Sequence, residues 1–93
     1  MEFVRAAEFY HEIATEERLC VQLISEGLHY LESKKWEEAI GLFNEAESLE
    51  RWIDLYGGKI YSSLAFANAQ IGNYTKAKYF LSLHKKVLGQ YYG

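Results

Sequence analysis

The fold is decided by residues 36–53, which read WEEAIGLFNEAESLERWI. Apolar residues recur along this stretch at the i, i+3, i+4, i+7 spacing of one helical face. They are Trp36, Ala39, Ile40, Phe43, Ala46, Leu49 and Ile53. The same spacing returns near the end of the chain, at Tyr74, Ala77, Leu81, His84 and Leu88. Because the chain also has no proline and no alternating strand pattern, we predict an all-α fold.

Charged residues and glycines predict where these helices end. Lys34 and Lys35 place positive charge at a helix C-terminus, which the helix dipole favours. Gly72 predicts a left-handed C-cap, and the pair at 57–58 predicts another helix end. Thr15 is a candidate N-cap that divides the first 32 residues, and an unbroken helix is the alternative. We expect five helices, over residues 2–14, 16–32, 36–56, 58–71 and 74–89.

An internal repeat is visible when the chain is shifted by 38 residues against itself. Residues of similar size then coincide: Leu23 with Tyr61, Gly27 with Ala65, Trp36 with Tyr74, Ala39 with Ala77 and Phe43 with Leu81. The repeating unit is one helix-turn-helix hairpin. A small residue at Gly27 or Ala65 lets two helix backbones approach each other.

These residues resemble the tetratricopeptide repeat (TPR) family. The first copy is Gly27-x-x-Tyr30 followed by Trp36-x-x-Ala39-x-x-x-Phe43-x-x-Ala46, and the second is Leu64-Ala65 followed by Gly72-Asn73-Tyr74-x-x-Ala77-x-x-x-Leu81. The resemblance covers about residues 20–91 and implies antiparallel hairpins stacked as a short right-handed superhelix. We expect one domain over residues 1–93, with a capping or half-repeat helix at 1–15, repeat 1 at 16–57 and repeat 2 at 58–93.

Length and composition narrow the class of protein. A chain of 93 residues forms a single domain, and a net charge of −3 argues against a general nucleic-acid binder. The only cysteine, Cys20, has no partner for an internal disulfide, which favours a reducing compartment. No apolar run is long enough to span a membrane. We therefore expect a cytoplasmic protein that binds neither nucleic acid nor membrane.

The charges are divided unevenly along the chain. Residues 1–57 hold all 13 acidic residues and five basic ones, whereas residues 58–93 hold five lysines and no acid. An acidic half and a basic half suit pairing between two copies of the chain. Docking of an acidic partner on the lysines and simple solvation of the surface are the alternatives.

Residues that could carry chemistry do not assemble into a known motif. There is no glycine-rich phosphate loop, Cys-x-x-Cys or Gly-x-Ser-x-Gly. Two Glu-x-x-His pairs, Glu8/His11 and Glu26/His29, place a carboxylate and an imidazole on one helical face, but a di-iron site needs two further buried glutamates. We expect His84 and Cys20 to be core residues. The sequence thus predicts no enzyme, catalytic residue, cofactor or metal.

The TPR resemblance implies a groove lined by the first helix of each hairpin, where a protein or peptide segment binds. The residues placed there are Val21, Ile24, Leu28, Leu31, Lys59, Ser62, Phe66 and Gln70. Bulky aliphatic side chains in this set favour a partner with an apolar face. Cover by the helix near residues 2–14, or by a second subunit, is the alternative.

A short repeat array also predicts an exposed edge, because each hairpin buries its faces mainly against its neighbours. We expect a self-association edge at Phe80, Val87, Tyr91 and Tyr92, and hence a homodimer; a fragment of a longer array exposes the same edge. The predicted function is a non-enzymatic protein-interaction module, such as an adaptor, scaffold or chaperone-like protein. The alternative is a bacterial peptide-responsive regulator of TPR type that lacks a DNA-binding domain.

Overall fold

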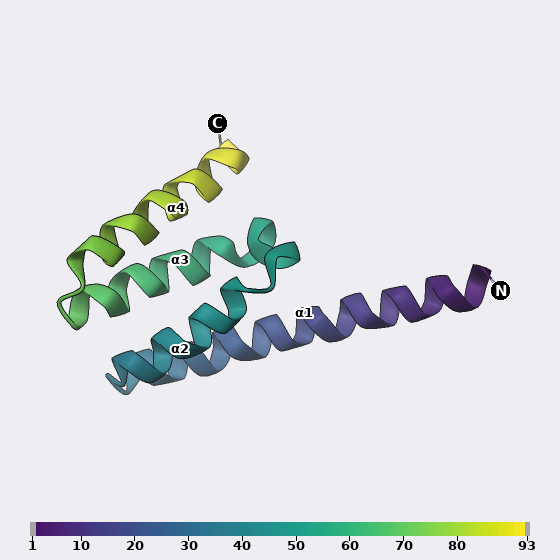
Figure 1. Cartoon of the computed structure of the whole chain (residues 1–93), viewed down its shortest axis with the longest axis horizontal. Coiled ribbons are helices and arrows are strands. Elements are labelled where there is room, and N and C mark those ends of the chain that lie inside the picture. Colours follow the sequence, from purple (N-terminus) through teal and green to yellow (C-terminus); the bar gives the residue numbers. More distant parts are fainter. Residues whose placement is uncertain (1, 93) are drawn as a thin grey trace.

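The described part of the chain folds into four α-helices joined by short connections (Figure 1). The computed structural model describes the backbone of residues 2–92 and the side chains of residues 5–89. In order, the elements are α1 (Glu2–Glu32), α2 (Trp36–Glu47), the 3-10 helix η1 (Glu50–Trp52), α3 (Ile53–Gln70) and α4 (Tyr74–Tyr92). The described residues include no strand, which confirms the prediction of an all-α fold.

The helices form two antiparallel hairpins, α1 with α2 and α3 with α4, and α2 packs against α3 (Figure 1). The molecule is elongated, with extents of 54 × 33 × 16 Å and a radius of gyration of 15.2 Å. A compact chain of this length has a radius of gyration of about 12 Å. The excess comes from the N-terminal half of α1, which projects beyond the other helices (Figure 1).

Both hairpins turn through the same backbone motif. At the end of α1, Lys34 adopts φ 60°, and the Lys35 amide donates to the Tyr30 carbonyl at 2.9 Å. At the end of α3, Gly72 adopts φ 84°, and the Asn73 amide donates to the Asn68 carbonyl at 2.8 Å. Each is a Schellman ending, in which a left-handed residue lets the chain cap the last carbonyls of the helix. The two left-handed residues are 38 positions apart, so the sequence repeat recurs in the backbone.

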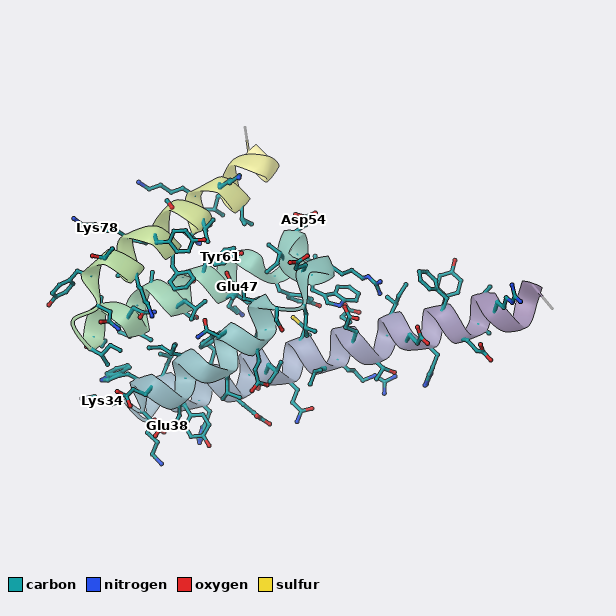
Figure 2. All side chains as sticks on the ribbon, viewed as in Figure 1. Lys34, Glu38, Glu47, Asp54, Tyr61 and Lys78 are labelled. Carbon is teal, nitrogen blue, oxygen red and sulfur yellow. The ribbon has the colours of Figure 1, made fainter. Side chains whose placement is uncertain are left out.

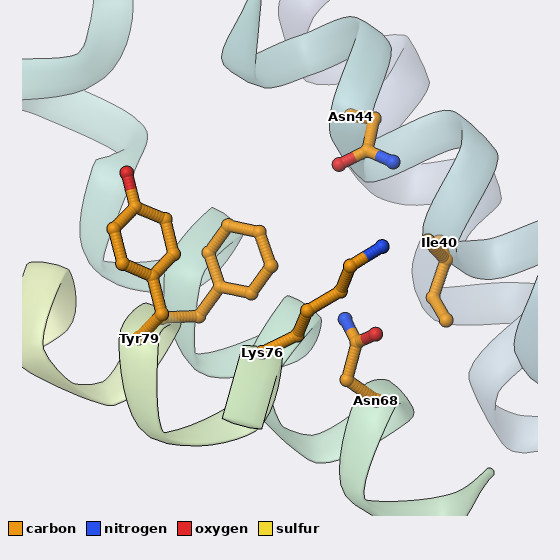
Figure 3. A pocket seen from close by; sticks show the side chains of 6 residues that line it. Ile40, Asn44, Asn68, Lys76 and Tyr79 are labelled. Carbon is orange, nitrogen blue, oxygen red and sulfur yellow. The ribbon is translucent and has the colours of Figure 1, made fainter. Parts of the chain in front are cut away.

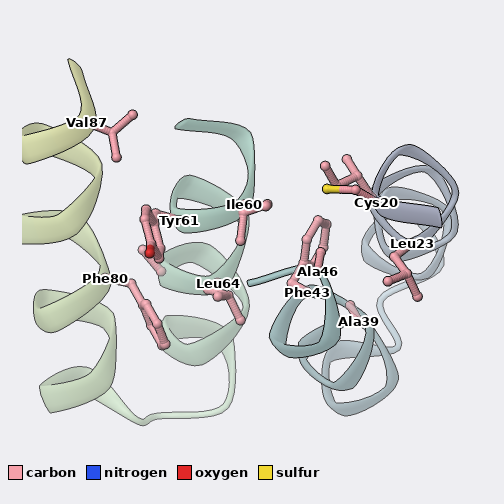
Figure 4. Close-up of a cluster of buried hydrophobic side chains, with 12 residues drawn as sticks. Cys20, Leu23, Ala39, Phe43, Ala46, Ile60, Tyr61, Leu64, Phe80 and Val87 are labelled. Atoms are coloured by element: carbon pink, nitrogen blue, oxygen red, sulfur yellow. The ribbon is translucent and has the colours of Figure 1, made fainter. Parts of the chain in front are cut away.

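The core lies between the helices of each hairpin and continues from α2 to α3 (Figure 4). Its fully buried members include Cys20, Ala39, Phe43, Ile60 and Leu64. Gly27 allows α1 to approach α2, because a Cβ atom there would lie 2.7 Å from the Phe43 ring. The expectation that Cys20 packs in the core is confirmed.

Two predicted helix boundaries are wrong. Thr15 does not divide the first 32 residues: its hydroxyl donates to the His11 carbonyl at 2.8 Å inside the continuous helix α1. The pair at 57–58 does not end a helix either, because both glycines lie within α3. Gly57 is buried where α3 meets α4, and a Cβ there would lie 3.3 Å from Val87 Cγ2.

The chain instead breaks between α2 and α3, at residues 48–49 and η1. Ser48 Oγ donates to the Glu45 carbonyl at 2.6 Å, which satisfies a carbonyl of the last turn of α2. The break turns α3 back alongside α2. The sequence did not predict it, because the apolar residues before and after the break follow the same helical spacing over residues 36–53. Over residues 2–92, four α-helices and one 3-10 helix therefore replace the five helices predicted.

None of the described helices is both long and apolar enough to cross a bilayer.

Candidate protein-interaction surface

The groove residues predicted on α1 differ in exposure. Val21 is 45% exposed, and Leu28 and Leu31 are half-buried at the margin of the core. Ile24 is only 5% exposed and belongs to the core cluster. Its prediction as a groove residue is corrected, because its helical position faces the core rather than the solvent.

The groove residues predicted on α3 are all exposed: Lys59, Ser62, Phe66 and Gln70. Phe66 is 51% exposed, and its ring meets the Trp36 ring of α2 edge to face, with centroids 5.7 Å apart. Such a contact fixes the orientation of the Phe66 ring while one face stays open to solvent. Ser62 Oγ donates to the Lys59 carbonyl at 3.2 Å within the helix.

The predicted self-association edge on α4 requires correction. Phe80 and Val87 are each 8% exposed, because they face α3 rather than the solvent (Figure 4). Phe80 stacks on Tyr61 with centroids 6.2 Å apart and an interplanar angle of 19°. Tyr91 and Tyr92 belong to α4, and their side chains lie outside the described residues.

Large apolar side chains are exposed on α4 at other positions, which sequence reasoning missed. Tyr74 is 65% exposed, Tyr79 58%, Leu81 47% and Leu88 41%. The error is one of helical phase, since Phe80 and Leu81 are adjacent in sequence but point in different directions. Assigning the buried face to Ala77, Phe80 and Val87, which lie on one helical face at the i, i+3, i+10 spacing, identifies the exposed set.

Sequence reasoning also missed the exposed aromatic residues near the N-terminus. Phe9 is 53% exposed and Tyr10 70%, and the two rings make an edge contact at 6.1 Å. The Arg51 guanidinium lies 5.9 Å from the centroid of the Phe9 ring. We expected this part of α1 to be a separate capping helix. The apolar residues that recur every seven positions from Ala6 to Cys20 instead indicate one continuous helix.

Two glutamates of α1 bond to side chains of η1 and α3. Glu16 accepts a hydrogen bond from Trp52 Nε1 at 3.0 Å, and Glu17 accepts one from the Tyr56 hydroxyl at 2.9 Å. The bond to Glu17 raises the pKa of Tyr56, because it stabilises the protonated hydroxyl. Burial, and then the charges of Glu16 and Glu17, raise the pKa of the Cys20 thiol. A raised pKa disfavours the reactive thiolate.

Tyr61 is a buried titratable group whose pKa is strongly shifted. Burial between α3 and α4, followed by the neighbouring Glu47 carboxylate, raises its pKa to about 12 (Figure 2). Burial disfavours the phenolate, and a nearby negative charge disfavours it further. This arrangement keeps the hydroxyl protonated and suits a packing role for the ring.

The histidines lie apart from one another. His84 Nδ1 is 3.0 Å from the Gly58 carbonyl, so this half-buried side chain bonds the backbone across the α3/α4 hairpin. His11 and His29 are exposed on α1. Within the described residues, no group of three or more His, Cys, Asp or Glu side chains could hold a metal ion.

A small pocket of about 160 Å³ opens between α2, α3 and α4 (Figure 3). It is lined by Ile40, Asn44, Asn68, Lys76, Tyr79 and Phe80. The buried Asn68 amide donates to the Leu64 carbonyl at 2.8 Å within its own helix. Sites for drug-sized ligands begin at about 300 Å³. The pocket is therefore a minor feature beside the exposed apolar side chains.

Comparison of the chain with protein-family models, with curated proteins and with solved structures finds no match.

Proposed function

We propose that this chain is a TPR-type interaction module, without enzymatic activity, that binds a segment of another protein. Support comes from the positions that carry the sequence resemblance. Gly27 packs directly on the Phe43 ring, as a small residue between two helices must. The left-handed residues that end α1 and α3 are 38 positions apart. A stack of two such hairpins as a short right-handed superhelix is part of this proposal.

The proposed binding surface consists of Val21, Leu28, Lys59 and Phe66, on the first helices of the two hairpins. The observation that carries the proposal is the exposure of Val21 and Phe66, at 45% and 51%, on the helices that the TPR resemblance assigns to the ligand groove. Single exposed apolar residues are common in proteins, so their position on these two helices is the informative feature.

The partner that fits this surface is an amphipathic helical segment. Valine, leucine and phenylalanine side chains accept an apolar face rather than a charged chain end. Lys59 is the only charged residue of the surface, and it is exposed on α3 where it can pair with an acid flanking the apolar face of the partner. A chain whose one cysteine is buried and unpaired suits a reducing compartment, so we place the module in the cytoplasm.

The test is selection from a displayed library of amphipathic helical peptides, followed by calorimetry with the best binder. We expect Val21→Asp and Phe66→Asp each to weaken binding about tenfold or more, because a charge then faces an apolar ligand. Tyr79→Asp is the matched control, since Tyr79 is 58% exposed on α4, outside the surface. Binding that survives both substitutions in a folded protein contradicts the proposed surface.

A further inference from the structure

The projecting half of α1 carries an apolar stripe that continues the core face of the same helix. We define the N-terminal stripe as Phe9, Tyr10 and Ile13, of which the two aromatic residues are exposed and Ile13 is half-buried. Each lies seven or 14 residues before a buried core residue, and seven residues span about two helical turns. The corresponding core residues are Cys20, Leu23 and Ile24. A surface that is built like the core therefore extends beyond the core.

A second apolar stripe runs along α4. We define the α4 stripe as Tyr74, Leu81 and Leu88, which are 65%, 47% and 41% exposed and follow one another at seven-residue intervals. Lys78 and Lys85 are exposed and lie one turn beyond Tyr74 and Leu81, so they border the stripe. At 1.5 Å per residue, the stripe is about 21 Å long, like a 14-residue helical segment.

The repeat indicates what kind of element the α4 stripe accepts. Tyr74 and Leu81 correspond to Trp36 and Phe43 in the 38-residue repeat. On α2 these positions are covered: Trp36 is half-buried against Phe66 of α3, and Phe43 is fully buried against Gly27 of α1. The equivalent positions of α4 are open. The elements that cover α2 are helices, so a helix with an apolar face suits α4.

The charges indicate which helix it is. Residues 5–17 contain four glutamates and one arginine, whereas α4 contains four lysines and no acid. A helix bearing glutamates beside its apolar stripe complements a stripe that lysines border. The same chain cannot bring the two together, because α2 and α3 lie between α1 and α4 and the N-terminal end of α1 points away (Figure 1).

We propose that the N-terminal stripe of one copy docks as a helix on the α4 stripe of a second copy. The contact is heterologous, since two different surfaces of the chain meet in it. It does not rest on the proposed function, because Val21 and Phe66 take no part in it.

The test is sedimentation of the full chain and of two double variants at about 100 µM protein, a concentration that detects micromolar affinity. Phe9→Asp with Ile13→Asp removes the N-terminal stripe, and Leu81→Asp with Leu88→Asp removes the α4 stripe. We expect the unaltered chain to self-associate and each double variant to do so at least about tenfold more weakly. A 1:1 mixture of the two variants should form a heterodimer, because the mixture retains one intact copy of each surface.

Controls separate this contact from loss of folding and from the peptide-binding surface. Circular dichroism checks that the double variants remain helical, and Tyr79→Asp, off the stripe, should associate like the unaltered chain. Charge reversal gives an independent test: Lys78→Glu with Lys85→Glu should abolish self-association, and Glu8→Lys with Glu12→Lys in the second chain should restore a heterodimer. Val21→Asp with Phe66→Asp should leave association unchanged.

Three results would overturn the proposal. The first is an unaltered chain that stays monomeric at about 100 µM, where micromolar association is measurable. The second is undiminished association of the double variant Leu81→Asp with Leu88→Asp. The third is a mixture of the two double variants that stays monomeric. The second result would mean that α1 pairs with another surface. The third would mean that the two stripes do not meet each other.

Discussion

The two hairpins share one turn but pack their helices differently. Both first helices are followed by a left-handed residue, Lys34 after α1 and Gly72 after α3. In the first hairpin, α1 approaches α2 over Gly27, whose missing side chain makes room for the Phe43 ring. In the second, the glycine at the helix contact is Gly57.

The core contacts also differ in chemistry. Leu23 is an aliphatic core residue of the first hairpin, whereas its counterpart in the repeat, Tyr61, stacks on Phe80. The repeat therefore fixes the position of the turn, and each hairpin has a small residue where its helices meet. Which side chains meet across each hairpin is free to vary.

Gly27→Ala should have the largest effect on stability. A Cβ atom would lie 2.7 Å from both Cε2 and Cζ of Phe43, and that ring is fully buried and cannot move into solvent. We expect a loss of about 3 kcal/mol in the free energy of unfolding, the upper part of the range for overpacked cores. Urea denaturation followed by circular dichroism measures it.

Two other glycines calibrate this result. Gly57→Ala meets milder contacts, at 3.1 Å from Ile53 and 3.3 Å from Val87, so we expect a smaller loss of about 1 kcal/mol. Gly41→Ala meets nothing within 4 Å and should raise stability by up to about 1 kcal/mol through helix propensity. Equal losses at Gly27 and Gly57 would contradict the difference drawn between the hairpins.

Tyr61, which the first hairpin replaces with leucine, should make the second hairpin sensitive to alkaline pH. Its pKa is about 12 in the folded protein against an ordinary value of 10.0, so the unfolded chain loses this proton first. The stabilisation is complete below pH 10 and declines as the pH rises toward 12. The unfolding free energy should fall by about 2 kcal/mol from this group by pH 12.

Tyr61→Phe isolates that contribution, because the other tyrosines remain in both proteins. The unfolding free energies of the variant and of the unaltered chain are compared between pH 9 and pH 12. The difference between them should shift steadily in favour of the variant above about pH 10. A constant difference across this range would show that Tyr61 does not titrate differently on folding. Tyr79→Phe, at an exposed position of α4, is the matched control.

The sequence predicted the helical class, the turns and much of the core, because those depend on local patterns. Helical spacing placed Ala39, Phe43 and Ala46 on a buried face, and all three are 0% exposed. Gly72 was predicted as a left-handed cap, and its φ of 84° confirms it. These features depend only on neighbours within a few turns.

What failed depends on tertiary contacts. The break at residues 48–49 carries neither proline nor glycine, and it is held by contacts from Trp52 and Tyr56 to α1, 36 and 39 residues away along the chain. The pair at 57–58 suggested a helix end, but Gly57 serves the contact with α4. For the candidate surface, the sequence predicted which helix carries each residue but not which way its side chain faces. Ile24 and Phe80 were therefore placed on exposed faces, although both are buried.

The smallest expected effect concerns the turn that the hairpins share. Lys34 adopts the left-handed conformation at φ 60°, which costs a residue with a side chain about 1 kcal/mol, and Gly72 avoids that cost. Lys34→Gly should therefore raise stability by up to about 1 kcal/mol, and Gly72→Lys should lower it by a similar amount. In a domain of this size, each change shifts the melting temperature by about 4–8 °C.

Ser33→Gly is the control for this prediction. The Ser33 amide still donates to the His29 carbonyl as in a helix, so glycine there should not stabilise the protein. If Lys34→Gly fails to stabilise the protein, the two turns do not share one backbone geometry in solution, and the 38-residue repeat is confined to the sequence.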